Sequence, residues 1–234
     1  FRIRFQCLLG LPQLDRIRWQ LFPEVRIPAT QATLFDSPSE SETDPSQLPE
    51  LMKVMDLQQE QLARSLGDGH RVIHGVAGSG KTLILGYRAE HLARVAQKPI
   101  LVLCYNRMLA TRLERWMASR GIADKVNVRS FHSWCASQLK TFHVASPAKG
   151  ESDDAFFAAM VQSGIDACSR GQIPSGQYKA VLIDESHDFR PEWLKLIVQM
   201  VDPHSNSLLI LYDDAQSIYS TGKKRNFSFK SLGI

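Results

Sequence analysis

The chain has 234 residues, of which 44% are hydrophobic and 22% are charged, values close to the average of globular proteins. This composition excludes a disordered, collagen-like or coiled-coil chain, and the length allows one large domain or one domain with part of another. The net charge of +4 is compatible with nucleic-acid binding but does not by itself indicate it.

The cysteines and apolar runs indicate the cellular setting. The four cysteines lie far apart, with neither a CxxC pattern nor a paired histidine, which predicts free thiols in a reducing cytosol rather than disulfides or a zinc site. Apolar runs such as Ile100–Cys104 are too short to cross a bilayer. We therefore expect a cytoplasmic protein without a membrane partner. Because the chain begins at Phe1 and stops abruptly at Ile234, we also expect it to be a fragment.

The first 50 residues predict two segments that precede the main domain. Residues 1–35 mix apolar and basic side chains and are interpreted as the tail of a preceding domain. Residues 36–50 are rich in Ser, Pro, Asp and Glu and contain no Lys or Arg. Such a segment cannot bury enough apolar surface to offset its ordering entropy, so it is predicted to be a solvated linker. The structured domain is then expected over residues 51–234.

From residue 51 onward, predicted helices and strands alternate. Strands are predicted at 71–75, 100–105, 126–131, 180–184 and 207–212, and helices at 51–66, 82–97, 108–120 and from Pro191 onward. Residues 132–178 are expected to be mostly helical. Alternation of this kind predicts an α/β fold in which helices cover both faces of a parallel sheet.

Residues 75–82, with the sequence GVAGSGKT, fit the pattern G-x-x-x-x-G-K-[ST] between a predicted strand and a predicted helix. The glycines let backbone N–H groups wrap phosphates, and the helix N-terminus adds a partial positive charge. Lys81 is expected to reach the β and γ phosphates of ATP, and Thr82 to ligate Mg²⁺. The other loop residues expected to contact nucleotide are Gly75, Ala77, Gly78, Ser79 and Gly80. The alternative is a Gly-rich turn that matches by chance.

The predicted strand that ends at Asp184 and Glu185 carries two carboxylates directly after an apolar run. In a parallel sheet, the carboxyl ends of the strands face the ligand crevice. We expect Asp184 to hold Mg²⁺, directly or through water, and Glu185 to act as the base that orients an attacking water. The alternative is a strand that ends in solvated acids, which is less favoured downstream of a complete phosphate loop.

Five motifs in order resemble the first RecA-like domain of UvrD/Rep-type superfamily 1 DNA helicases, over about residues 50–234. The resemblance implies a P-loop NTPase with a RecA-like three-layer α/β/α sandwich and a mostly parallel sheet. Residues 57–61 resemble the motif in which a glutamine, here Gln59, reads the adenine edge. Residues 212–219 resemble the motif whose glutamine, here Gln216, senses the γ-phosphate and couples it to DNA.

Residues 104–106 and 130–134 resemble two motifs of that family that contact single-stranded DNA. The resemblance implies that Tyr105, Asn106, Phe131 and His132 contact the DNA. Base–aromatic stacking tolerates any base sequence. For Phe131, and for Trp134 in the same motif, the alternative is a core position between sheet and helix.

Two residues depart from the family pattern. Residues 184–189 resemble the "DExQDF" box, but His187 stands where the family usually has Gln. Tyr212 replaces the Gly that usually precedes the Asp pair. These departures concern the coupling between the γ-phosphate and DNA rather than the fold.

Taken together, the resemblance implies the ATP-hydrolysing motor domain of a DNA helicase or translocase, acting in DNA repair or recombination. Its implied partners are single-stranded DNA and a second RecA-like domain of the same full-length chain, which supplies arginines to the transition state. The fragment alone is therefore expected to be inactive. Two alternatives stay open: a P-loop ATPase of another class, and a catalytically silent helicase-like module attached to a nuclease-related (NERD) domain, of which residues 1–35 would be the tail.

Overall fold

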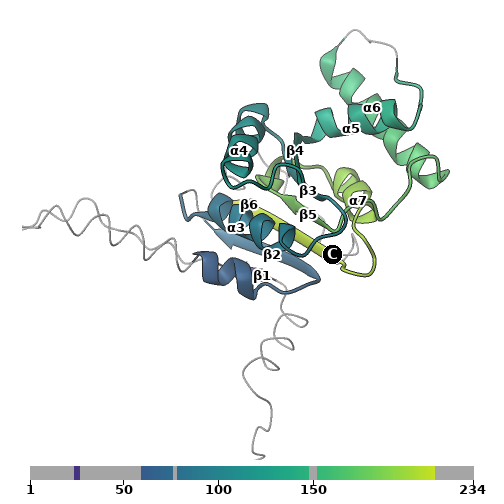
Figure 1. Ribbon diagram of the computed structural model, residues 1–234. Coiled ribbons are helices and arrows are strands. Elements are labelled where there is room, and N and C mark those ends of the chain that lie inside the picture. Colours follow the sequence, from purple (N-terminus) through teal and green to yellow (C-terminus); the bar gives the residue numbers. More distant parts are fainter. Residues whose placement is uncertain (1–23, 27–58, 76–77, 148–151, 214–234) are drawn as a thin grey trace, which may run out of the picture.

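A single sheet of six parallel strands organises the part of the chain that the structure describes. The computed structural model describes residues 24–26, 59–75, 78–147 and 152–213. The strand order is β1-β2-β6-β5-β3-β4 (Figure 1). The strands are β1 (Glu24–Arg26), β2 (His70–Gly75), β3 (Ile100–Cys104), β4 (Val126–Ser130), β5 (Ala180–Ile183) and β6 (Ser207–Asp213).

Helices connect these parallel strands, because each connection must carry the chain from the end of one strand back to the starting end of the next. They are α3 (Lys81–Ala93), α4 (Arg107–Ser119), α5 (Phe131–Thr141), α6 (Asp153–Ser169) and α7 (Pro191–Gln199), with a short 3₁₀ helix, η1 (Ser186–Asp188). Residues 59–65 are also helical. None of the helices in the described ranges is long and apolar enough to span a bilayer.

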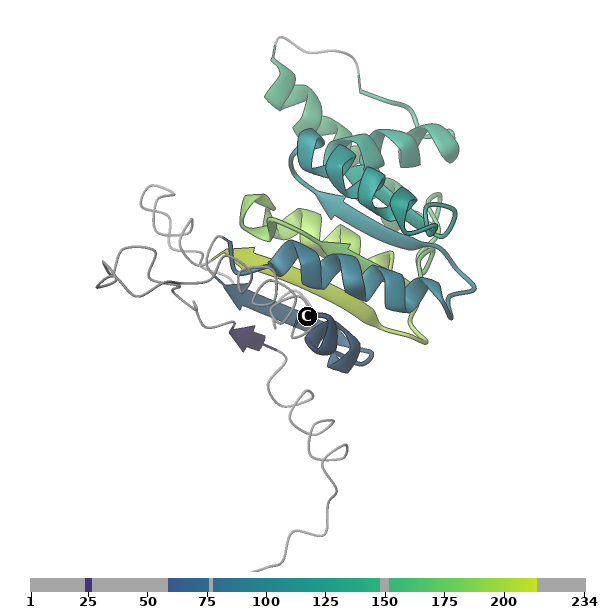
Figure 2. The same cartoon turned by 60° about the vertical axis from the view of Figure 1, so that its left-hand side comes forward.

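The strands β3 and β5 are apolar along their whole length, as expected where both faces of the sheet are covered. In β3, Leu101 and Leu103 contribute to one core, with α5, α6 and α7. Ile100 and Val102 contribute to the other, with α3 and α4. Figure 2 shows α3 lying across the sheet, and α5 and α6 lie together on the β4 side. The predicted three-layer α/β arrangement with a parallel sheet is thus confirmed.

The predicted elements exist, with shifted ends. The helix predicted over 82–97 ends at Ala93, and the strand predicted over 126–131 ends at Ser130, since Phe131 already begins α5. The mostly helical region over 132–178 resolves into α5 and α6. Pro191 is the first residue of α7, where its missing N–H costs no hydrogen bond.

The strand β1 lies within the segment that the sequence assigns to a preceding domain. It pairs in parallel with β2, at the edge of the sheet opposite β4. Three residues of that segment therefore extend the same sheet. The linker predicted over 36–50 lies outside the described residues, so the proposed domain boundary stays a prediction.

Candidate functional site

The phosphate loop joins β2 to α3 at the carboxyl edge of the sheet. Gly78 and Gly80 have φ angles of +78° and +80°, in the left-handed region that L side chains rarely adopt. Gly80 is also the residue that caps α3, and a Cβ added there would collide with the Gln59 side chain. The backbone conformation therefore favours glycine at position 80, and any larger residue would also displace the Gln59 side chain. Ala77 lies outside the described residues.

Gln59, on the helix at 59–65, lies directly against this loop. Its Nε2 donates to the carbonyl oxygen of Ser79 at 3.3 Å. Its Oε1 and the Ser79 Oγ are buried and have no hydrogen-bond partner among the described residues. Buried polar groups are normally satisfied, so these two atoms fit a site that a polar ligand completes.

Lys81, the first residue of α3, points back toward the sheet. Its Nζ donates to the carbonyl oxygen of Gly75 at 2.7 Å and lies 3.6 Å from Oδ2 of Asp213. Gly75 and Asp213 are opposite each other in the β2–β6 register, which brings the acid to the phosphate loop. The ammonium group is almost buried, with 10% of its side chain exposed, and the Asp213 carboxylate offsets the desolvation of its charge.

Thr82 and Asp184 meet although they are far apart in the sequence. The Thr82 hydroxyl donates to Oδ2 of Asp184 at 2.8 Å, and Oδ1 of Asp184 accepts from the backbone N–H of Glu185 at 3.0 Å. Burial raises the pKa of Asp184, while the Thr82 hydrogen bond and the charge of Lys81 oppose that shift. A hydroxyl beside a carboxylate is an oxygen ligand set of the kind that Mg²⁺ takes. The residues expected to hold the metal therefore fit it.

Glu185 follows β5 at the mouth of this site. Its φ angle of +54° is unusual for a residue with a side chain. Burial and the neighbouring Asp184 carboxylate raise the pKa of Glu185. Glu185, His187 and Asp188 have ligand atoms within 4.8 Å of one another, which makes them a second group in the described ranges that could hold a metal ion.

A separate pocket lies at the ends of β3 and β4, on the same edge of the sheet. It has a volume of about 270 Å³ and is lined mainly by aromatic and basic side chains. Tyr105 and Trp193 stack with ring centroids 6.4 Å apart, and His132 contacts Phe157 at 4.6 Å. Tyr105 is 43% exposed, so its ring is accessible from solvent. A larger groove of about 610 Å³ shares His132 and Phe157 and continues between α4 and α6.

The cations of this pocket also act on His132. Burial lowers the pKa of His132, and the positive charges of Arg107 and Arg190 lower it further. The guanidinium of Arg190 lies 5.6 Å from the ring centre of Trp193, within the range of a cation–π contact. Two arginines and the acid Asp154 thus lie around a space with aromatic walls.

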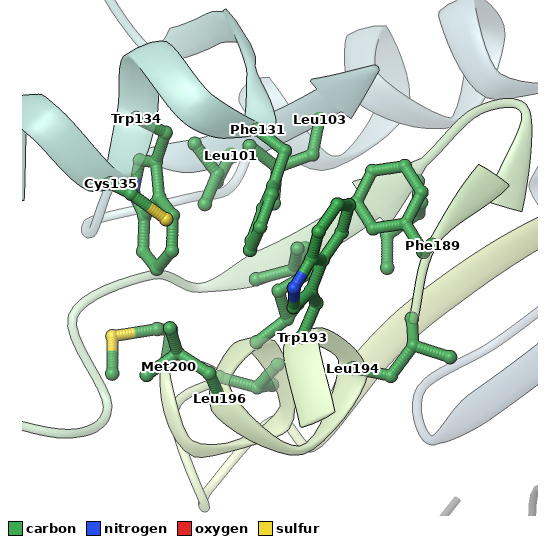
Figure 3. Packing of buried hydrophobic residues seen from close by; sticks show 14 of the residues in the cluster. Leu101, Leu103, Phe131, Trp134, Cys135, Phe189, Trp193, Leu194, Leu196 and Met200 are labelled. Carbon is green, nitrogen blue, oxygen red and sulfur yellow. The ribbon is translucent and has the colours of Figure 1, made fainter. Parts of the chain in front are cut away.

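The other predicted DNA-contact residues lie differently. Phe131 is fully buried and stacks on Trp193 at 4.6 Å (Figure 3), so the core alternative describes its position and its ring is not accessible to a base. Trp134 is also buried and donates to the Tyr178 hydroxyl at 3.2 Å. Asn106 caps α4, since its Oδ1 accepts from the backbone N–H of Met108 at 2.8 Å.

Sequence reasoning missed several residues of the pocket. Arg107 and Arg190, which follow the predicted motifs, and Phe157 and Trp193, which lie on α6 and α7, line it together with Tyr105. Each looks like an ordinary surface or core residue in its own segment, so no local pattern marks it. Gln216, the predicted γ-phosphate sensor, lies outside the described residues.

Comparisons with known proteins agree with the nucleotide site. Residues 58–222 match the family described as AAA domain, a P-loop NTPase-type domain found in UvrD/Rep-like helicases. No curated protein matches the chain. The match spans the phosphate loop and the acidic strand end. Since the matched residues make up more than half of the chain, it belongs to the AAA domain family of P-loop NTPases, with the RecA-like fold, and this class binds a nucleotide together with a divalent metal.

Proposed function

We propose that the chain is the ATP-binding motor domain of a UvrD/Rep-type DNA helicase or translocase. The observation that carries this proposal is that the acidic end of β5, which contacts the phosphate loop through Thr82, and the aromatic pocket at β3 occupy neighbouring strand ends of one sheet. The backbone N–H of Asp184 donates to the carbonyl oxygen of Leu103 at 2.9 Å, two residues before Tyr105. This hydrogen bond joins the acidic strand end to the strand that precedes Tyr105.

In this proposal, the nucleotide is ATP. The backbone of the phosphate loop and Lys81 bind its phosphates, and Gln59 contacts the adenine edge. Thr82 and Asp184 hold Mg²⁺, which offsets charge on the phosphate oxygens during hydrolysis. Glu185 accepts a hydrogen bond from the attacking water and takes its proton, a role favoured by its raised pKa. Gln216 senses the γ-phosphate.

Single-stranded DNA is the proposed second ligand. The half-exposed ring of Tyr105 provides a surface on which a base can stack, and His132 forms another wall of the same pocket. Arg107 and Arg190 provide positive charge for phosphates at the pocket rim. Stacking together with backbone charge is how proteins bind single strands without sequence preference.

The proposal includes a second RecA-like domain elsewhere in the same protein, which supplies arginines to the bound ATP. An arginine in that role increases phosphoryl-transfer rates by about 10³–10⁵. We also propose that the protein acts in DNA repair or recombination. We place it in the cytoplasm, where ATP is available and where thiols such as those of Cys104 and Cys135 stay reduced.

The deciding experiment measures ATP hydrolysis by the full-length protein with and without single-stranded DNA. Wild type is expected to be stimulated by DNA, and Lys81→Ala to lose both hydrolysis and translocation. Lys140→Ala, which changes an exposed lysine of α5, is the matched control. Hydrolysis without DNA stimulation would instead support a P-loop ATPase of another class. Equal translocation by wild type and Lys81→Ala would contradict the motor function.

A further inference from the structure

The two residues that depart from the helicase pattern contact each other. His187 in η1 and Tyr212 in β6 are 25 positions apart in the sequence, but their rings meet edge to face with centroids 6.4 Å apart and planes at 86°. Tyr212 also contacts His74 of β2 at 5.2 Å. An aromatic residue at position 212 therefore fills the space beside the His187 ring, which a glycine would leave open.

His187 in turn contacts the carboxylate that the proposed reaction depends on. Its Nε2 lies 3.3 Å from Oε2 of Glu185 and 3.7 Å from Oδ2 of Asp188. Only 10% of the His187 side chain is exposed, whereas 36% of the Glu185 side chain is. A nearly buried ring thus contacts a carboxylate that is otherwise partly free in solvent.

The backbone alone does not hold the Glu185 carboxylate in one direction. Glu185 follows the end of β5 and has a left-handed φ of +54°, a conformation that persists only where the surroundings impose it. A glutamate side chain also has three rotatable bonds and loses substantial entropy when it is fixed. A donor on a rigid ring can restrict it, because an imidazole carrying hydrogen on Nε2 donates in both its neutral and its protonated form.

We propose that His187 is a positioning residue for Glu185 and that Tyr212 holds the His187 ring in place. In this arrangement the Nε2–H of His187 orients the Glu185 carboxylate toward the attacking water, and the edge-to-face contact with Tyr212 limits rotation of the imidazole. The inference rests on the proposed role of Glu185 as the base. The ring contact gives the two departures a shared structural role.

The test compares steady-state ATP hydrolysis and nucleotide affinity in the full-length protein. His187→Ala is expected to lower kcat by about tenfold or more while the affinity for Mg-ATP stays within about twofold, as expected when an outer residue orients a reacting group. His187→Gln, which restores a side-chain donor, should recover most of the rate. His204→Gln, at an exposed histidine before β6, is the matched control.

A double-mutant cycle separates positioning from a general loss of structure. In a Glu185→Gln background, His187→Ala should cause little additional loss of rate, because the group that it orients is already gone. Tyr212→Gly should reduce the rate in the same direction as His187→Ala, and Tyr212→Phe should preserve most of it since the ring remains. An unchanged kcat in His187→Ala, or an equal loss in the Glu185→Gln background, would overturn the inference.

A crystallographic comparison keeps this inference distinct from the proposed function. The Glu185 carboxylate should contact His187 in wild type and move or become disordered in His187→Ala. If wild type does not hydrolyse ATP but this displacement occurs, the proposed function fails and the positioning contact stands. If wild type hydrolyses ATP and the carboxylate does not move in His187→Ala, the positioning role fails and the proposed function stands.

Discussion

Two regions share the carboxyl edge of the sheet, and they are built in different ways. The nucleotide region, at the ends of β2, β5 and β6, consists of charged and hydroxyl groups that contact one another, such as Lys81 with Asp213 and Thr82 with Asp184. The pocket at the ends of β3 and β4 consists of rings from several elements, with arginines around them.

In the proposed function, this difference has a physical reason. Phosphates and a divalent metal require fixed charges and oriented dipoles, which a loop and two strand ends provide over a few residues. A base presents a flat apolar face, which any suitably placed ring can contact. The nucleotide region is therefore concentrated in short motifs, and the pocket is assembled from side chains such as Tyr105, Phe157 and Trp193, which come from separate elements.

The largest expected effect tests the nucleotide region alone. Glu185→Gln removes the proposed base but retains its size, so kcat for ATP hydrolysis should fall by about 10²–10⁴-fold while nucleotide binding persists. Steady-state kinetics and equilibrium binding of Mg-ATP provide the measurement. Asp124→Asn, at an exposed acid between α4 and β4, is the control. A loss of affinity without a loss of kcat would mean that Glu185 binds ligand rather than acting as base.

The next effect tests whether Phe131 belongs to the core or to the pocket. Because Phe131 is fully buried against Trp193, Phe131→Ala should destabilise the fold by about 3–5 kcal/mol. Urea unfolding followed by circular dichroism measures this, with Val95→Ala as an exposed control. Weaker DNA binding at unchanged stability would instead assign Phe131 to the pocket.

A smaller effect is expected at Tyr105. Tyr105→Ala should weaken single-stranded DNA binding by about 1–3 kcal/mol, the range of one base stacked on an aromatic ring. Fluorescence anisotropy with a labelled oligonucleotide provides the measurement. Tyr105→Phe keeps the ring and should retain most of the affinity. Equal affinity of Tyr105→Ala and wild type would show that DNA does not use this ring.

The smallest effect concerns the pH dependence of stability. Burial, with Arg107 and Arg190, lowers the pKa of His132 in the folded state. The unfolded chain therefore binds a proton more readily at this residue. The contribution of His132 to stability is present above the ordinary histidine pKa of about 6.5 and is lost as the pH falls below it, toward the lowered folded value.

Replacing His132 should remove its part of the stability loss at low pH. Urea unfolding should be measured at pH values above and below about 6.5. The free energy of unfolding should fall less steeply on acidification for His132→Gln than for wild type. His143→Gln, at an exposed histidine after α5, should retain the wild-type slope. If the two variants have the same slope, the pocket does not disfavour a positive charge on His132.

By itself, the sequence determined the fold class, the phosphate loop and the acidic strand end. Each of these depends on a local pattern: apolar runs for buried parallel strands, glycines where the loop needs a left-handed backbone, and carboxylates directly after a strand. The ends of elements were less certain, as at Phe131, where the first turn of α5 replaces the last residue of the predicted strand.

Only the tertiary structure decided which side chains meet. The contact of Lys81 with Asp213 depends on β6 lying between β2 and β5, a strand order that does not follow the order of the chain. Likewise, the burial of Phe131 and the contact between His187 and Tyr212 arise from side chains on different elements. Packing between distant segments determines which residues are neighbours, and the local sequence around each residue does not predict these contacts.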